Sequence, residues 1–155
     1  MKSSTKTRRH AADRRRGLID TSVLIDLDRI DPDDLPDEMT IAAVTLAELA
    51  AGPHATGDAD ERARRQDRLQ RTEATFVPIP FDADAARAYG RVYAAVVAAG
   101  RKARGRRAID LLIAATALAA RMPLYTLNPA DFVGLTGLVD IVALPARADS
   151  ADSTP

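Results

Sequence analysis

The sequence predicts an α/β fold, in which helices cover both faces of a mostly parallel sheet of four to five strands. Two observations support this prediction. Short apolar segments typical of strands alternate with segments of helical periodicity, which is the order of βαβ units. Right-handed crossovers between such strands place helices on both faces of the sheet. The length of 155 residues fits a single domain.

The first half of the chain supplies two expected strands and three expected helices, separated by turns rich in Asp, Pro and Gly. Thr45 is expected to open the second helix, and Gly52-Pro53 to end it. The third helix is rich in arginine and has few large apolar residues, so we expect it at the periphery. The expected elements are a strand at 17–20, a helix at 21–29, a strand at 40–44, a helix from 45 and a helix at 58–75.

The second half continues the alternation. Asp82 is expected to cap a long helix that Gly100 ends, and a stripe of Tyr89, Val92 and Tyr93 on this helix is assigned to the core. Asp110 is expected to open an Ala- and Leu-rich helix. The remaining expected elements are strands at 76–79, 124–126 and 139–144, with the last helix running to 120.

The formal net charge of zero hides a strong separation of charge. Residues 1–16 hold seven basic residues and one acidic residue, a net charge of +6, and show no apolar periodicity. We expect them to form a disordered basic tail, with a second tail at 146–155 and one folded domain at 17–145. Within that domain, residues 101–107 hold five basic residues, which form a basic loop.

Composition excludes several classes of protein. The chain has no cysteine, which excludes a disulfide scaffold, a thiolate metal site and a cysteine nucleophile. Its two histidines, His10 and His54, have no ligand partner nearby in sequence, which argues against a zinc hydrolase. The longest apolar run, at 111–120, is about half of a membrane span, and no apolar signal segment is present. We therefore expect a soluble, cytoplasmic protein with no membrane partner.

Acidic residues recur where the expected strands end. Asp20 ends the first strand, Glu48 follows the second by one helical turn, Asp110 starts a helix, and Asp131 follows a later strand with Asn128. In a parallel sheet the ligand site lies outside the carboxyl ends of the strands. Gathered carboxylates repel one another, and Mg²⁺ or Mn²⁺, which prefer oxygen ligands, would relieve that repulsion.

Each acid also has a purely structural interpretation. Asp20 and Asp110 fit helix N-caps, and residues 45–48 (TLAE) fit a capping box in which Glu48 bonds back to the backbone. Taken singly, capping is favoured for Glu48 and Asp110. Taken together the acids argue against capping alone, because apolar neighbours crowd Asp20 and Asp110, where an unpaired charge is costly. The hydroxyls of Thr21, Ser22 and Thr126 fit either site contacts or turn residues.

Four segments in order resemble the motifs of PIN-domain ribonucleases. They are residues 18–25 (LIDTSVLI), 45–49 (TLAEL), 110–115 (DLLIAA) and 126–132 (TLNPADF). Their set, order and spacing are most similar to the toxins of VapBC-type toxin–antitoxin pairs, over residues 17–145. The resemblance implies a PIN-like three-layer α/β/α sandwich and metal-dependent endonucleolytic cleavage of RNA. It makes Asp20, Glu48 and Asp110 the metal-site acids. In the fourth motif Asn128 occupies one candidate position, so Asp131 is the expected carboxylate.

As a hypothesis, Asp20 and Asp110 bind the principal Mg²⁺ or Mn²⁺, and Glu48 and Asp131 complete the catalytic site. Thr21, Ser22, Thr126 and Asn128 are possible polar contacts there. The basic loop is expected to bind the RNA backbone, although a solvated charge run is the commoner meaning of such a segment. Its basic residues are Arg101, Lys102, Arg104, Arg106 and Arg107.

The expected partners follow mainly from the resemblance. They are an RNA substrate, a VapB-like antitoxin and a second copy of the chain in a homodimer. An antitoxin segment could occupy an exposed apolar groove near Ile25, Leu46 and Leu49, although the same residues could equally belong to the core.

Two other functions fit part of the sequence. Asp20 after a first strand resembles an aspartyl-phosphate phosphotransfer site, but Ser22 breaks the Asp-x-Asp spacing, and lysine occurs only at positions 2, 6 and 102. A catalytically weak PIN-like RNA- or protein-binding module is the second alternative. Asn128 leaves room for it, whereas the three intact acids favour an enzyme.

Overall fold

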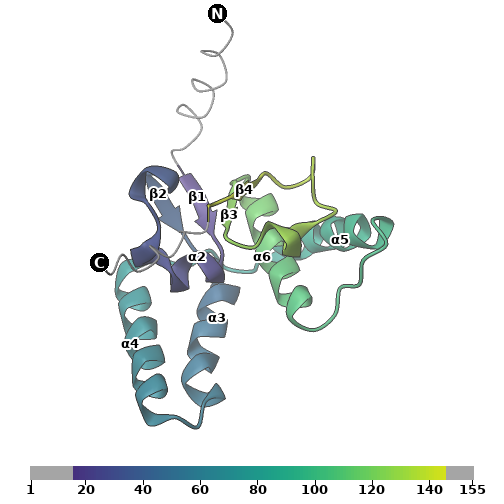
Figure 1. Cartoon of the computed structure of the whole chain (residues 1–155). Coiled ribbons are helices and arrows are strands. Elements are labelled where there is room, and N and C mark those ends of the chain that lie inside the picture. The colour runs from purple at the N-terminus through teal and green to yellow at the C-terminus, as the bar shows by residue number, and fades with distance from the viewer. Residues whose placement is uncertain (1–15, 146–155) are drawn as a thin grey trace, which may run out of the picture.

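The structure is a computed structural model that describes residues 16–145 (Figure 1). Four parallel strands form one sheet in the order β2-β1-β3-β4, which confirms the predicted parallel α/β architecture. The strands are β1 Arg16–Ile19, β2 Glu38–Thr40, β3 Leu124–Thr126 and β4 Ile141–Ala143. Arg16, assigned above to the tail, begins β1. The tails expected at 1–15 and 146–155 lie outside the described residues.

Within residues 16–145, five α-helices and four 3₁₀ turns connect the strands. The helices are α2 Thr21–Ile25, α3 Ala43–Ala51, α4 Ala59–Thr75, α5 Ala83–Ala98 and α6 Arg106–Ala120, and the 3₁₀ turns are η1 Leu27–Arg29, η2 Pro32–Asp34, η3 Gly52–Ala55 and η4 Pro129–Phe132. The expected cap by Asp82 is confirmed, since its carboxylate accepts the Ala85 N–H at 2.9 Å. Asp58 caps α4 in the same way, through the Glu61 N–H at 3.0 Å.

Alternate residues of the two central strands face opposite sides of the sheet. Leu18 and Leu124 pair in register and belong to the core that packs under α5 and α6. Ile19 and Tyr125 pair next and belong to the core on the other face, with α2 and α3. Figure 1 shows α5 and α6 on one side of the sheet and the α3–α4 hairpin on the other. This is the three-layer arrangement predicted above.

The strand expected at 40–44 lies earlier in the chain. β2 ends at Thr40 and α3 already begins at Ala43, with Ala42 as its N-cap. Apolarity misplaced this strand: Ile41 and Ala42 are fully buried, yet they form the connection between β2 and α3. Consequently Thr45 does not open α3 but lies within its first turn, fully buried.

The prediction of a strand at 76–79 is also wrong. Within the described residues this segment contributes a single parallel bridge, in which Ile79 pairs with Ala42. The Ala43 N–H donates to the Ile79 carbonyl and the Ile79 N–H donates to the Ile41 carbonyl, both at 2.8 Å. Val77, counted as a strand residue, is 89% exposed. The segment therefore closes the base of the α3–α4 hairpin and adds no fifth strand to the sheet.

Two further expectations about helices are corrected. The helix expected at 21–29 is the short α2 followed by the 3₁₀ turn η1. On α5, Val92 is fully buried as expected, but Tyr93 is 47% exposed and lies outside the core. No helix within residues 16–145 combines the length and the apolar character needed to cross a bilayer.

Candidate active site at the carboxyl ends of the strands

Asp20 lies where β1 ends and is the N-cap of α2. The residue as a whole is 5% exposed, and its carboxylate accepts three hydrogen bonds. The Oδ1 atom accepts the Val23 N–H at 3.1 Å and the Ser22 hydroxyl at 2.6 Å, and Oδ2 accepts the Thr126 hydroxyl at 2.5 Å. Asp20 therefore does cap its helix, and the same carboxylate is held in one orientation from β1, α2 and β3.

The two hydroxyls that bind Asp20 are themselves anchored by the backbone after β3. The Leu127 N–H donates to Ser22 Oγ at 3.2 Å, and the Asn128 N–H donates to Thr126 Oγ1 at 2.9 Å. Ser22 and Thr126 therefore link Asp20 to the backbone that follows β3. Asn128 is exposed and reaches this network through its backbone.

Glu48 comes from α3 and is bound by a side chain. The Thr21 hydroxyl donates to Glu48 Oε1 at 2.6 Å and lies 3.3 Å from the Thr45 hydroxyl oxygen. The capping-box interpretation of Glu48 is wrong, because α3 has Ala42 as its N-cap and no side-chain cap bond. Because α3 starts at Ala43, two residues before Thr45, Glu48 lies in the second turn of the helix, where its side chain reaches Thr21 of α2.

Asp110 is not an N-cap either. α6 begins at Arg106 after Gly105, whose φ of 61° suits glycine, so Asp110 lies in the second turn. Burial is the largest cause that raises the pKa of Asp110 to about 6, and the negative charges of Asp131, Glu48 and Asp20 raise it as well. Arg106 acts in the opposite direction. The carboxyl thus lies in the field of three other acids, with one cation as partial compensation.

Asp131 lies on η4, the turn that follows β3, and is half-buried. Its charge has the largest effect of the three carboxylates on the pKa of Asp110. The four acids predicted from the sequence therefore share one electrostatic neighbourhood, although they come from four different segments of the chain. Their common place is the carboxyl end of β1 and β3, as the strand-end rule predicts.

The carboxylate oxygens of this site fit a hard divalent cation that takes only a few of its ligands from the protein. Within residues 16–145, no three acidic or histidine side chains converge closely enough to form a ready-made metal cage. Mg²⁺ is commonly held by one or two carboxylates, with waters and substrate phosphates completing its shell. The negative charge around Asp110, which Arg106 compensates only in part, favours such an ion, and the oxygen-only ligands favour Mg²⁺ or Mn²⁺ over softer metals.

The basic loop approaches this site from the amino-terminal end of α6. Arg101, Lys102, Arg104 and Arg106 are exposed, and Arg107 is partly buried. Arg106 and Arg107 belong to the first turn of α6, one turn before Asp110. The sequence treated the five as one loop; the structure divides them between a loop and a helix. Of these five residues, Arg106 acts on the pKa of Asp110.

Comparisons with known proteins match most of the chain. The family model described as PIN domain matches residues 17–132. Ribonuclease VapC5 of Mycobacterium tuberculosis is 35% identical over 128 residues, covering 81% of this chain and 91% of that protein. Ribonuclease VapC of Rickettsia bellii is 29% identical over 135 residues, covering 84% and 97% respectively. A solved structure of VapBC-5, a member of the VapBC family of toxin–antitoxin systems from M. tuberculosis, has a TM-score of 0.72 and covers 84% of this chain and 98% of that one.

Proposed function

The chain belongs to the PIN-domain family and, within it, to the VapC ribonucleases, and on that basis we propose that it is a Mg²⁺- or Mn²⁺-dependent endoribonuclease acting as the toxin of a toxin–antitoxin pair. The observation that carries this proposal is the match to the VapC ribonucleases, 35% identical over 128 residues in one case, and the three acids whose charges surround the half-buried Asp110 support a metal site. The charges of Asp131, Glu48 and Asp20 disfavour the ionised form of Asp110, and a bound cation would offset that repulsion.

Asp20 and Asp110 would hold the metal ion. Asp20 is the fixed member, because three hydrogen bonds determine the direction of its two oxygens. When bound, the metal lowers the pKa of a water molecule and offsets the charge that develops on the phosphate. Glu48, oriented by Thr21, and Asp131 would position that water or accept its proton.

The basic loop would hold the RNA backbone beside the acids. Arg101, Arg104 and Arg106 are exposed and would supply charge-assisted hydrogen bonds to phosphate oxygens. Such contacts are independent of sequence, so they give affinity and register, while specificity comes from RNA shape and polar contacts. Because the proposed substrate is RNA, we propose the cytoplasm as the place of action.

We propose a VapB-like antitoxin as the protein partner, supported by the VapBC-5 structure. Ile25 at the end of α2 is 42% exposed, and Leu46 on α3 is half-buried in the same core cluster as α2. They offer apolar contacts to a partner segment near the acids. Homodimerisation is proposed on the exposed apolar residues of α5, Tyr93 at 47% and Val97 at 51%.

Two substitutions test the metal site. Asp20→Asn and Asp110→Asn, assayed on RNA with Mg²⁺, are expected to lose at least about a hundredfold in cleavage rate, in the range of a lost acid–base or metal contribution. Asp60→Asn, at an exposed carboxyl in the first turn of α4, is the matched control. Circular dichroism shows whether each variant is folded. Folded variants that cleave at the parental rate would refute the assignment.

A calorimetric Mn²⁺ titration separates the enzyme from a catalytically weak binding module. We expect the parent to bind Mn²⁺ and both site variants to bind it more weakly, while the Asp60→Asn control binds as the parent does. Absence of binding to the parent at millimolar metal would favour the binding module.

A further inference from the structure

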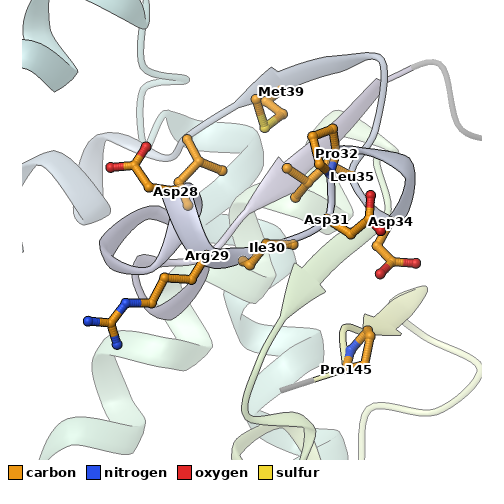
Figure 2. A pocket seen from close by; sticks show the side chains of 10 residues that line it. Asp28, Arg29, Ile30, Asp31, Pro32, Asp34, Leu35, Met39 and Pro145 are labelled. Carbon is orange, nitrogen blue, oxygen red and sulfur yellow. The ribbon is translucent and has the colours of Figure 1, made fainter. Parts of the chain in front are cut away.

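A second feature lies apart from the four acids. A cavity of about 770 Å³ opens between the segment after α2, the strand β2 and the end of the described chain. Figure 2 shows it from close by, with Met39 and Pro145 at opposite ends of the view. We call this cavity the acidic groove. It is lined by Leu27, Asp28, Arg29, Ile30, Asp31, Pro32, Asp34, Leu35, Met39 and Pro145. None of the four site acids lines it.

The acidic groove combines apolar walls with negative charge. Leu27, Ile30, Leu35 and Met39 supply the walls, and three aspartates stand among them. Among the described residues of the lining, Arg29 is the one that is basic, and in Figure 2 its guanidinium points away from the other labelled side chains. Such a surface suits a ligand that is cationic at its tips and apolar along its stems, as lysine and arginine side chains are.

The surrounding sequence is strongly acidic. Residues 26–38 contain seven acidic residues and one arginine, a net charge of −6. Asp31 uses its carboxylate to cap η2, accepting the Asp33 N–H at 3.0 Å. Glu38 forms an ion pair with Arg16, at 3.3 Å between Glu38 Oε2 and Arg16 Nε. This much negative charge on one segment repels itself, so a basic partner stabilises the fold.

The chain carries a segment of the required charge. Residues 1–15 hold six basic residues and one acidic residue, a net charge of +5. This segment joins the described chain at Arg16, which pairs in register with Glu38, while the following Gly17 pairs with Met39 of the groove. It therefore starts beside the groove, and fifteen residues span up to about 50 Å when extended, so reach is not limiting.

Two observations distinguish this segment from other occupants. The family match begins at residue 17, and 84% of this chain covers 98% of the VapBC-5 structure, so residues 1–15 are an addition to the shared domain. The carboxy-terminal segment 146–155 also starts beside the groove, at Pro145. It holds one arginine and two aspartates, so its net charge has the same sign as that of the groove.

We propose that residues 1–15 bind in the acidic groove of their own chain. Their arginine and lysine tips pair with Asp28, Asp31 and Asp34, while the methylene stems pack on the apolar walls. The segment then acts as a clamp that joins β2 to the segment after α2. The clamp is independent of the four acids and of the proposed ribonuclease activity.

The absence of cysteine allows a direct test. A nitroxide is attached to a Ser4→Cys variant of the full chain, and amide signals are measured by NMR with the label oxidised and reduced. At low salt we expect the oxidised label to weaken the Leu27, Leu35 and Met39 signals at least about twofold. The effect is expected to disappear at about 1 M salt, where the Debye length is about 3 Å.

Two charge variants of the labelled chain test whether the contact depends on these charges. Replacing Arg8, Arg9, Arg14 and Arg15 by Gln removes charge from the segment, and Asp28→Asn with Asp34→Asn removes charge from the groove. Each is expected to abolish the effect while the remaining amide spectrum stays that of the parent.

Three results would overturn the proposal. One is signal loss that is uniform or centred on another surface. Another is an effect that survives both charge variants. The third is groove broadening that depends on mixing isotope-labelled chain with nitroxide-labelled chain, which would assign the contact to a second copy.

Discussion

The hydroxyl of Thr21 donates a 2.6 Å hydrogen bond to the carboxylate of Glu48, which joins the first turn of α2 to the middle of α3. Thr21 is the neighbour of Asp20 in sequence, so the orientation of one acid is linked to the position of another. The hydroxyls of Ser22 and Thr126 bind Asp20 in the same way. Neutral hydroxyls thus fix two acids without adding charge to a site that already carries four carboxylates.

Thr21→Val is expected to slow RNA cleavage about tenfold, the equivalent of about 1.4 kcal/mol, because a hydrogen bond to a charged group is lost while the volume is kept. Thr21→Ser retains the hydroxyl and is expected to retain most of the activity. Cleavage rates and a Mn²⁺ titration measure the effect, with thermal unfolding as the control for folding. A valine variant that matches the parent in both assays would show that Thr21 does not orient Glu48.

Asp110 is expected to make the metal-free protein less stable at neutral than at mildly acidic pH. Its pKa is raised from 3.8 to about 6 in the fold, so the folded state binds more protons than the unfolded state between these values. Stability attributable to Asp110 therefore falls as pH rises from about 4 to about 6 and stays low above that range. Because solvent screens a half-buried carboxyl, we expect an effect on the order of 1 kcal/mol.

Urea unfolding with a chelator at pH 5 and pH 7.5 measures this effect. Asp110→Asn has no carboxyl to titrate, so its loss of stability between the two pH values is expected to be smaller than that of the parent. Equal losses in the two proteins would contradict the prediction. Added Mn²⁺ is expected to raise the stability of the parent at pH 7.5.

Replacing Arg104, Arg106 and Arg107 by Gln is expected to weaken RNA binding and to reduce its dependence on salt. Up to three phosphate contacts are lost, and each contributes about 0.7 to the slope of log K against log salt for single-stranded nucleic acid. The control is Arg64→Gln with Arg71→Gln on α4, where each arginine is paired with an acid of its own helix. An unchanged slope in the triple variant would exclude the basic loop from RNA binding.

Gly17→Ala is expected to destabilise the fold by about 1–3 kcal/mol through overpacking. A Cβ atom at Gly17 meets Cε2 and Cδ2 of the buried Tyr125 ring, the latter at 2.8 Å, and Pro36 Cγ at 3.0 Å. Gly57→Ala is the matched control, because a Cβ there has no neighbour within 4 Å, and we expect a change within about 0.5 kcal/mol. Equal unfolding midpoints for the two variants would contradict this prediction.

Local pattern was sufficient for most of the fold. The alternation of strands and helices gave the parallel sheet, and the Asp82 cap and the Gly52-Pro53 stop are found as expected. Errors arose where burial and secondary structure disagree. Ile41 and Ala42 are as buried as any strand residue, yet they connect β2 to α3. Apolarity reports burial, and only pairing with another segment of the chain decides between strand and connection.

The site shows the same division. The four acids could be found because strand ends carry ligand sites in parallel sheets, and this rule uses only the order of elements. Thr21, Ser22 and Thr126 could be named as possible contacts, but not which acid each of them binds. The hydrogen bond from Thr126 to Asp20 spans 106 positions of the sequence, and the Thr21–Glu48 bond spans 27. Such pairs depend on tertiary geometry, so hydroxyls that orient the site resembled ordinary turn residues.

The Ala42–Ile79 bridge has a consequence for how the site is completed. It closes the α3–α4 hairpin at its base, so the two ends of the hairpin meet at one point beyond the end of β2. Glu48 belongs to that hairpin, whereas Asp20, Asp110 and Asp131 belong to the sheet ends and to α6. Opening of the hairpin as a local unit would leave a folded sheet with an incomplete set of acids. Hydrogen exchange at α3 would then track the fraction of molecules that are folded yet inactive.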